Sequence, residues 1–354
     1  MAYRVIQWST GNVGHFALRC ILEHPELELA GVWVSSAAKA GKDAGELCGR
    51  PPTGVRATND ADALLELAAD CVCYTATADL RPFEAVEDVC RILKAGKDVV
   101  SSSIVPLVHP RSFFAEVVDK LEDACRRGGT SFFTSGIDPG FANDLLPLTL
   151  SGLCGRWDEI RILEIINYAT YDQPQVLFET MGFGKPLDHT PLLLTPGTLA
   201  FAWGGTIRLL ADGLGVEIEE IRQTCERRPA TRALRIAGRT VAPGTMAALR
   251  FEVQGIVGGR PALVVEHVTR LDDALAPEWP RGKGYRVVIT GVPSMSCDFT
   301  FGDERGDHAV GGVLLTATRL VNAIPAICRA QPGLLSALDL PLITGRGLYA
   351  GARG

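Results

Sequence analysis

Residues 3–19, YRVIQWSTGNVGHFALR, indicate how this chain folds. The apolar run over residues 5–8 predicts a β-strand, and the pattern from Phe16 onward predicts an α-helix. Between them, Gly11 and Gly14 mark a tight turn. A strand–turn–helix corner of this kind presents unpaired backbone N–H groups and the positive end of a helix dipole. The stretch therefore predicts a phosphate-binding corner near the start of the sequence.

The glycine spacing at this corner is GxxGxxA, with Gly11, Gly14 and Ala17. We expect Gly11 to allow backbone angles closed to other residues, and Gly14 to let the helix approach a pyrophosphate closely. Asn12 and Val13 lie between the glycines and belong to the same predicted contact. A short glycine motif is weak evidence by itself, and a helix-entry turn without a ligand is the alternative.

The residues that follow repeat the alternation of strand and helix, which favours a bound dinucleotide over a turn without a ligand. Strand patterns cover residues 27–36, 70–75, 98–103 and 130–134, and helix patterns cover residues 63–69, 83–95 and 112–127. Strands separated by helices predict βαβ units and a parallel sheet with helices on both faces. We expect the first strand at the centre of that sheet, as in a Rossmann fold.

The pattern changes after about residue 150. Residues 156–168 alternate between polar and apolar, as a half-exposed strand does. Further strand-like runs cover 231–241, 246–257, 261–269 and 285–291; helices are expected at 199–210, 216–225 and 311–330. The predicted fold class is therefore α/β, with an N-terminal Rossmann parallel sheet and a second α+β domain built on a mostly antiparallel sheet.

These patterns divide the chain into two domains. We place a dinucleotide-binding domain at residues 1–147 and a substrate and dimerisation domain at residues 148–308. The last helix is too apolar for a surface position, so residues from about 309 to 354 are expected to pack back on the first domain.

Composition narrows the class of protein. The 354 residues are 47% hydrophobic and 21% charged, with a formal net charge of -6. A net negative chain without basic clusters argues against nucleic acid as a partner. We expect no signal peptide, no membrane span and no metal site. The ten cysteines are scattered, as in a protein of the reducing cytoplasm.

The end of the second strand predicts which nucleotide is bound. An acidic residue there would hold the ribose 2′-hydroxyl of NAD, whereas small hydroxyl groups and a cation would accept the 2′-phosphate of NADP. The sequence offers Ser35, Ser36 and Lys39, with no acidic residue before Asp43. We therefore predict NADP(H) over NAD(H), with NAD(H) as the less favoured choice. A solvated loop in which Lys39 contacts nothing is the alternative.

Three later segments are expected to reach the cofactor, because ligands of parallel sheets lie at the carboxyl ends of the strands. The predicted residues are Thr75, Ala76 and Thr77 after one strand, Ser102 after the next, and Pro139 and Gly140 in the corner GIDPGFAND (136–144). A polar loop and a domain-boundary turn are the alternatives for the second and third segments.

TGNVG after the first strand, the corner GIDPGFAND, the strand-rich second half and the tail DLPLITGRG (339–347) resemble known proteins. The chain is similar to the dihydrodipicolinate-reductase-like superfamily, and within it to the branch of 2,4-diaminopentanoate dehydrogenases and native amine dehydrogenases. The resemblance covers nearly the whole sequence. It implies an NAD(P)-dependent oxidoreductase that acts on CH–NH2 donors, and a homodimer.

Two departures from these relatives bear on the chemistry. True dihydrodipicolinate reductases carry a His-His pair with a nearby lysine in the second domain, and this chain has no such pair. The amine dehydrogenases typically place a glutamate just after the fifth strand, where this chain has Ile104 and Val105. Ile104 and Val105 carry no carboxylate, so they cannot take the role of that glutamate.

Other side chains are candidates for the acid–base work. In an alternating strand, Glu164 points to the same face as Ile162, Ile166 and Tyr168, and that face is otherwise apolar. Glu164 is therefore either a functional buried acid or an ion-paired structural residue. Tyr168 could donate a phenolic hydrogen bond, and Asp138 beside the predicted nicotinamide end is the second acid.

The walls of a substrate pocket can also be proposed from the sequence. The candidates are Ile104, Tyr171, Phe178 and Met181. At this spacing, Phe178 and Met181 could equally be ordinary core residues. An apolar lining favours an aliphatic or cyclic ketone over a charged keto acid.

The predicted function is NADP(H)-dependent amine dehydrogenase-like chemistry: reductive amination of small ketones or aldehydes with ammonia, or the reverse oxidative deamination. Side chains are needed mainly to handle ammonia and protons, because the cofactor carries the hydride. One alternative is an NADP(H)-dependent reductase of C=O or C=C bonds without ammonia. Another is a protein that senses NADP(H) without turnover.

Overall fold

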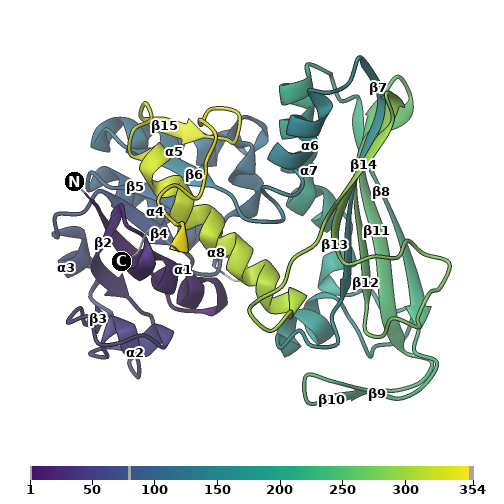
Figure 1. Cartoon of the computed structure of the whole chain (residues 1–354), viewed down its shortest axis with the longest axis horizontal. Helices are drawn as coiled ribbons and strands as arrows, with labels where there is room; N and C mark the ends of the chain where they lie inside the picture. The colour runs from purple at the N-terminus through teal and green to yellow at the C-terminus, as the bar shows by residue number, and fades with distance from the viewer. Residues whose placement is uncertain (1, 79–80, 351–354) are drawn as a thin grey trace. The chain divides into compact units, whose positions relative to one another are not determined.

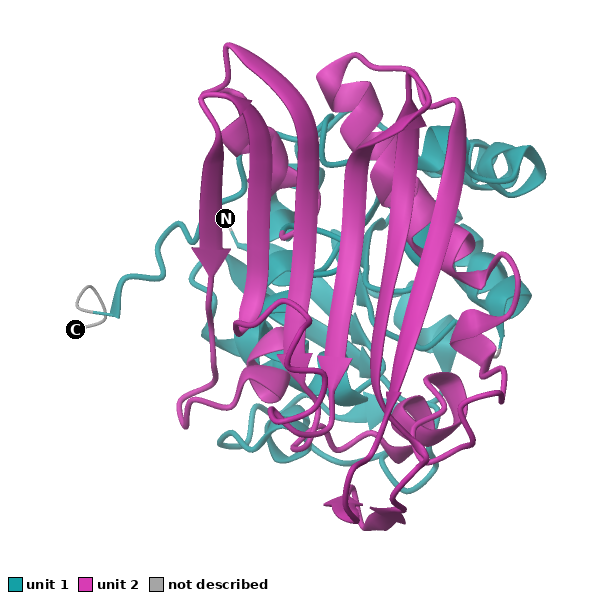
Figure 2. Ribbon diagram, turned by 90° about the vertical axis from the view of Figure 1, so that its right-hand side faces the viewer, with its two compact units in different colours: residues 1–141, 313–354 teal, residues 142–312 magenta. Residues whose placement is uncertain are grey.

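The computed structural model describes residues 2–78 and 81–350, which form two compact units. Unit 1 comprises residues up to Phe141 together with those from Val313 onward, and unit 2 comprises Ala142–Gly312 (Figures 1 and 2). The chain thus returns to its first unit after completing the second.

Unit 1 is built on a parallel sheet of seven strands in the order β15-β6-β5-β4-β1-β2-β3. The strands are β1 (Tyr3–Trp8), β2 (Leu27–Trp33), β3 (Ala57–Thr58), β4 (Cys71–Tyr74), β5 (Asp98–Ser101), β6 (Ser131–Thr134) and β15 (Gly333–Leu335). The β1 strand lies inside the sheet between β4 and β2, where the strand order reverses. That reversal is the place where dinucleotides bind in folds of this kind.

Helices cover both faces of this sheet. They are α1 (Asn12–Glu23), α2 (Ala44–Cys48), α3 (Ala61–Leu65), α4 (Pro82–Lys94), α5 (Ala115–Gly128) and α8 (His308–Ile327). Successive residues of β1 point to opposite faces: Val5 packs in one core with α1 and α8, whereas Ile6 packs in another with α4 and α5. The predicted α/β class with a Rossmann-like parallel sheet is confirmed.

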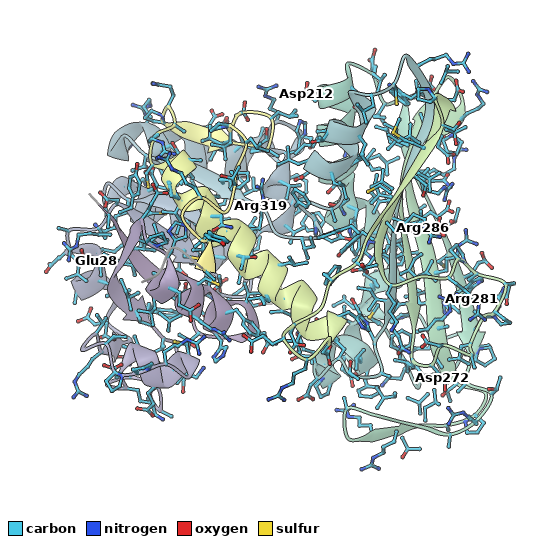
Figure 3. The ribbon with its side chains drawn as sticks, in the orientation of Figure 1. Glu28, Asp212, Asp272, Arg281, Arg286 and Arg319 are labelled. Atoms are coloured by element: carbon cyan, nitrogen blue, oxygen red, sulfur yellow. The ribbon has the colours of Figure 1, made fainter. Side chains whose placement is uncertain are left out.

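Helix α8 is long and apolar enough to cross a membrane by length and composition. Its inner face nevertheless belongs to the core of unit 1, where Leu320, Val321 and Ile324 are buried. The buried Arg319 of the same helix (Figure 3) lies over the ring of Phe133, 5.9 Å from its centroid. The apolar composition of α8 is therefore accounted for by packing within this unit.

Unit 2 is built on a six-stranded sheet in the order β14-β13-β7-β12-β11-β8. The strands are β7 (Arg156–Asn167), β8 (Glu220–Pro229), β11 (Met246–Val257), β12 (Arg260–Arg270), β13 (Gly284–Val292) and β14 (Met295–Phe299). The β7–β12 pair is parallel and the other neighbours are antiparallel, so the prediction of a mostly antiparallel sheet holds. Figure 2 shows these long strands side by side.

Two helices accompany this sheet, α6 (Leu145–Ser151) and α7 (Thr198–Leu214). Ile207 and Leu210 of α7 are buried in the same core as Val253 and Val265 from β11 and β12. The opposite face of the sheet carries charged side chains, among them Arg161, Glu252 and Glu266.

Two element predictions in this unit are wrong. Residues 216–225 were expected to be helical, but Glu220–Pro229 form strand β8 and pair along their whole length with β11. Pairing with a neighbouring strand overrides the local helical spacing at this sheet edge. The run 231–241 is not one strand but a hairpin of β9 (Leu234–Ile236) and β10 (Arg239–Val241), turning at Ala237 and Gly238, both with positive φ.

Candidate active site

The corner after β1 in unit 1 has the form expected of a phosphate site. Helix α1 begins at Asn12 with Gly11 as its N-cap residue, and no side chain caps its N–H groups. The first-turn N–H groups of Asn12, Val13 and Gly14 therefore lie at the positive end of the helix dipole without a side-chain acceptor at the cap. An anionic pyrophosphate fits that arrangement.

The roles of Gly11 and Gly14 in the structure differ from those expected from the sequence. Gly11 has a φ of -74°, open to any residue, while the unusual backbone belongs to Ser9, with a φ of +79°. At Gly14, an added Cβ would collide with the carbonyl oxygen of Ser9 and lie 2.6 Å from Oγ1 of Thr75. Gly14 is thus required for packing of α1 against the ends of β1 and β4, not only for approach to a ligand.

Lys39 binds the glycine corner directly. Its Nζ donates to the carbonyl oxygen of Thr10 at 2.9 Å and to Oγ1 of Thr10 at 3.1 Å. Ser35 and Ser36 are exposed just beyond β2. Asp43, the first acidic residue after β2, is engaged elsewhere, since its carboxylate accepts N–H groups from the loop at Thr53 and Gly54.

The other predicted strand ends lie along the same carboxyl edge. Oγ1 of Thr75 donates to the carbonyl of Trp8 at 3.0 Å, and the N–H of Ser102 donates to the carbonyl of Tyr74 at 3.3 Å. Ala76 accepts a hydrogen bond from the Ser103 hydroxyl, whereas Thr77 is exposed. These contacts join β1, β4 and β5 at the edge where a cofactor is expected.

Ile104 follows β5 in a left-handed conformation, with φ 54° and ψ 53°. A β-branched residue rarely adopts these angles, and such strain clusters at functional sites. Ile104 is also nearly buried. Its place at the carboxyl edge fits the predicted pocket role, although its aliphatic side chain offers no acid.

The corner after β6 is tightly closed. The N–H of Phe141 donates to the carbonyl of Gly136 at 3.0 Å, and the N–H of Ile137 donates to Oγ1 of Thr316 on α8 at 3.2 Å. Gly140 has a φ of +149°, and an added Cβ there would collide with Gly136. Asp138 and Pro139 at this corner are half-buried.

Glu164 on β7 is the central acid of unit 2. Its side chain is buried, with the residue 8% exposed. Oε1 accepts a hydrogen bond from the hydroxyl of Tyr285 at 2.9 Å, and Oε2 lies 2.7 Å from Nδ1 of His267. Tyr285 on β13 and His267 on β12 are the residues directly beside Glu164 in the sheet register. The three side chains therefore form one cluster across adjacent strands.

Aromatic rings surround this cluster. The imidazole of His267 stacks on Phe251 with centroids 4.6 Å apart, and the ring of Trp203 meets it edge-on at 4.7 Å. Tyr285 stacks near Phe301 at 5.9 Å. A carboxylate in such a setting has little water around it, so its charge interacts strongly with nearby polar groups.

The two candidate tyrosines lie close to each other. Tyr168 and Tyr171 stack with centroids 4.6 Å apart, and Nε2 of Gln173 donates to the Tyr171 hydroxyl at 2.7 Å. Burial, and after it the negative charge of Glu164, raises the pKa of Tyr171 to about 12. Tyr171 therefore stays protonated at neutral pH and remains a hydrogen-bond donor.

Phe178 and Met181 belong to the main core of unit 2. The guanidinium of Arg239 lies over the ring of Phe178, 4.8 Å from its centroid. Packing in this core is enough to account for an apolar side chain at both positions. His267 and Tyr285 are not among the residues predicted from the sequence, although each stands in an apolar run of a predicted strand, 261–269 and 285–291.

A nucleotide-binding parallel sheet and a second sheet domain with a buried, hydrogen-bonded acid define a dehydrogenase of the NAD(P) class. The comparisons agree. The sequence model of the 2,4-diaminopentanoate dehydrogenase C-terminal domain matches residues 141–349. The chain is 45% identical to an amine dehydrogenase of Streptomyces virginiae, over 95% of this chain and 96% of the relative.

More distant relatives extend this result. The 2,4-diaminopentanoate dehydrogenase of Acetoanaerobium sticklandii is 25% identical over 79% of this chain and 76% of its own. The structure of an amine dehydrogenase from Mycobacterium smegmatis has the same fold, with a TM-score of 0.77 at 20% identity and 97% of each chain covered. The chain therefore belongs to the family of amine dehydrogenases and 2,4-diaminopentanoate dehydrogenases. The predicted family and the predicted enzyme class, an oxidoreductase, are confirmed.

Proposed function

We propose that this protein is an NADP(H)-dependent amine dehydrogenase that acts on CH–NH2 groups. In the direction of synthesis, a small ketone or aldehyde, ammonia, a proton and NADPH would give an amine, water and NADP+. The observation that carries the proposal is the buried carboxylate of Glu164, held by Tyr285 and His267 among aromatic rings. The family of the chain supports the same chemistry.

The side chains of unit 2 supply what the reaction asks of the protein. The bound cofactor would provide the hydride. Glu164 would hold the positive charge of the ammonium or iminium group and accept its proton. Tyr168 and the protonated Tyr171 would orient the substrate, and the aromatic surroundings would keep bulk water away. Asp138 on unit 1 is proposed as the second acid.

The cofactor would lie along the carboxyl edge of unit 1. The proposed contacts are Gly11, Asn12, Val13, Gly14, Ser35, Ser36, Lys39, Thr75, Ala76, Thr77, Ser102, Pro139 and Gly140. The uncapped start of α1 suits the pyrophosphate. Lys39 and the two exposed serines suit a 2′-phosphate, which supports NADP(H) over NAD(H).

The choice of nucleotide can be tested at Lys39. Replacing Lys39 by Gln is expected to weaken NADPH binding about tenfold, because a hydrogen bond between charged partners is lost. NADH binding should change less than twofold. Calorimetric titration of the variant and the wild type with both nucleotides measures this. An equal loss for both would contradict a 2′-phosphate contact and indicate a role of Lys39 in holding the Thr10 corner.

The reaction itself is tested by NADPH oxidation with a panel of small ketones and aldehydes, with and without ammonia. Ammonia-dependent oxidation that yields the amine is expected. Equal rates without ammonia would instead establish a C=O or C=C reductase, which the aliphatic residues after β5 at Ile104 favour. Tight NADPH binding with no turnover on any substrate would favour a sensor.

We also propose a homodimer in the cytoplasm. The resemblance to the amine dehydrogenase branch supports the dimer, and the ten free cysteines suit a reducing compartment. Light scattering is expected to give twice the chain mass of 37.9 kDa at working concentration. A mass of one chain would contradict the dimer.

A further inference from the structure

We infer that His267 is a positioning residue that holds the carboxylate of Glu164 in one orientation; the inference rests on the proposed role of Glu164. No motif singles out His267, and the tertiary structure brings it to the acid. Its Nδ1 lies 2.7 Å from Oε2 of Glu164. The imidazole and the carboxylate therefore lie within hydrogen-bond distance of each other.

A buried carboxylate needs donors for both oxygens, because desolvation disfavours its charge. Glu164 meets this need from two sides: the Tyr285 hydroxyl of β13 holds Oε1, and His267 of β12 holds Oε2. Tyr285 is a neutral donor at neutral pH. His267 can carry a positive charge, so it stabilises the carboxylate more than a neutral donor would.

The ring of His267 is itself held in place. Phe251 of β11 stacks on it with an interplanar angle of 10°, and Trp203 of α7 meets it at 63°. Among the residues of unit 2, the imidazole is in contact with the carboxylate of Glu164 from β7 and with these two rings from β11 and α7. An imidazole with its proton on Nδ1 donates to a carboxylate whether the ring is neutral or charged. With the ring fixed by its two aromatic neighbours, His267 presents Nδ1–H to Glu164 in a fixed direction.

Two substitutions separate positioning from packing. In His267→Phe, a flat ring can still stack on Phe251, but the donor to Glu164 is gone. In His267→Asn, an N–H donor is kept and the ring is lost. His189→Phe is the matched control, because His189 is exposed in the same unit. Far-UV circular dichroism and the midpoint of thermal unfolding report that each variant is folded.

The kinetic test uses amine oxidation by the full chain. His267→Phe is expected to lower kcat/KM about tenfold to a hundredfold, with the loss mainly in kcat. His267→Asn is expected to keep most of the wild-type kcat, because its side-chain amide retains an N–H donor for Glu164. Equal losses of kcat in His267→Phe and His267→Asn would overturn the inference.

A second test needs no turnover. The ring N–H signals of the histidines in isotope-labelled protein are recorded by NMR, and that of His267 is assigned by its loss in His267→Phe. We expect Glu164→Gln to move the Nδ1–H signal of His267 upfield, since the hydrogen bond to a charged acceptor is lost. An unchanged signal would overturn the inference even in an active enzyme. If the shift is seen but no carbonyl or amine turns over, the proposed function fails and the pairing stands.

Discussion

Replacing Glu164 by glutamine is expected to lower kcat/KM for amine formation and oxidation by a factor of about 10² to 10⁴, the usual range for loss of a positioned acid–base group. Glutamine has the shape of the acid and can still accept the hydrogen bond from Tyr285. It cannot ionise, so it can neither hold an iminium charge nor take a proton. Steady-state rates in both directions, with the midpoint of thermal unfolding as a check of folding, measure the effect.

Glu220→Gln provides the control, because Glu220 lies on the exposed edge strand β8 and pairs with Arg222 on the same strand. That variant should keep wild-type rates. If Glu164→Gln also kept more than about a third of the activity, an essential role of this acid in proton transfer would be wrong. Asp138 would then be the acid to replace next.

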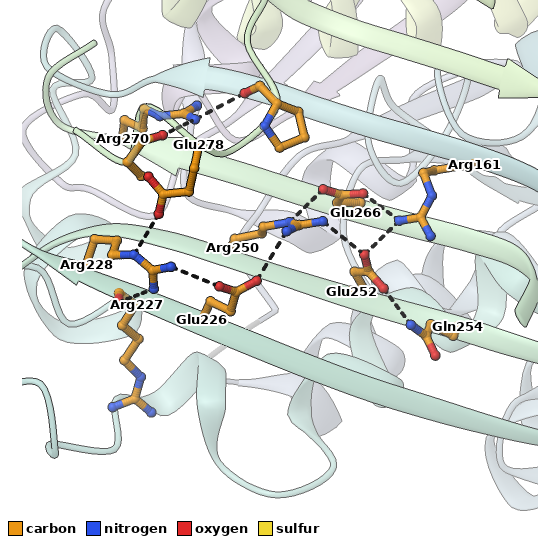
Figure 4. A network of polar contacts seen from close by, with 12 residues as sticks. Arg161, Glu226, Arg227, Arg228, Arg250, Glu252, Gln254, Glu266, Arg270 and Glu278 are labelled. Atoms are coloured by element: carbon orange, nitrogen blue, oxygen red, sulfur yellow. Dashed lines mark hydrogen bonds and ion pairs between the residues drawn. The ribbon is translucent and has the colours of Figure 1, made fainter. Parts of the chain in front are cut away.

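Replacing Glu266 by glutamine is expected to lower the free energy of unfolding by about 3 kcal/mol, because the charge-assisted hydrogen bonds to the half-buried Arg161 and Arg250 are weakened. Glu266 is 1% exposed on the charged face of the unit 2 sheet. Its Oε2 accepts from Arg161 at 2.6 Å and its Oε1 from Arg250 at 2.8 Å (Figure 4). Urea unfolding of wild type and variant measures the loss, with the same slope of unfolding free energy against urea concentration used for both.

The control for this prediction lies in the same network. Glu226 also pairs with Arg250, but its side chain is 45% exposed, so Glu226→Gln should cost less than about 1 kcal/mol. Equal losses in the two variants would show that burial of Glu266 does not set its contribution.

The same network gives stability a dependence on pH. Burial alone would raise the pKa of Glu252, but hydrogen bonds from Gln254 and Arg161 outweigh it and hold the pKa below the ordinary 4.5. A carboxyl group whose pKa is lowered on folding stabilises the folded state above its unfolded pKa. That contribution is therefore lost as the pH falls below about 4.5 and through the lower folded value.

The architecture of unit 1 could be predicted from sequence because its signals are local. Alternating strand and helix patterns, with turns at Gly11 and Gly14, mark each βαβ unit within a few residues. The reason for Gly14 could not be predicted in full, since the Ser9 carbonyl and Thr75 that crowd it come from two different strand ends. The helix predicted at 216–225 was wrong for a similar reason: pairing with strand β11, which lies further along the chain, decides the structure there.

The contacts of the candidate acid Glu164 could not be predicted from the sequence. Strand parity alone placed Glu164 on an apolar face, which is enough to suspect a buried carboxylate. Its partners His267 and Tyr285 lie about a hundred residues further along the chain. Which residues stand beside each other depends on the register of three strands, and a slip by one residue would turn each side chain to the other face. The α/β class and the suspicion about Glu164 came from periodicities that act over a few residues, so they could be predicted before any strands were paired. The groups that hold this carboxylate could not be predicted, because strand register is set by packing across the whole sheet.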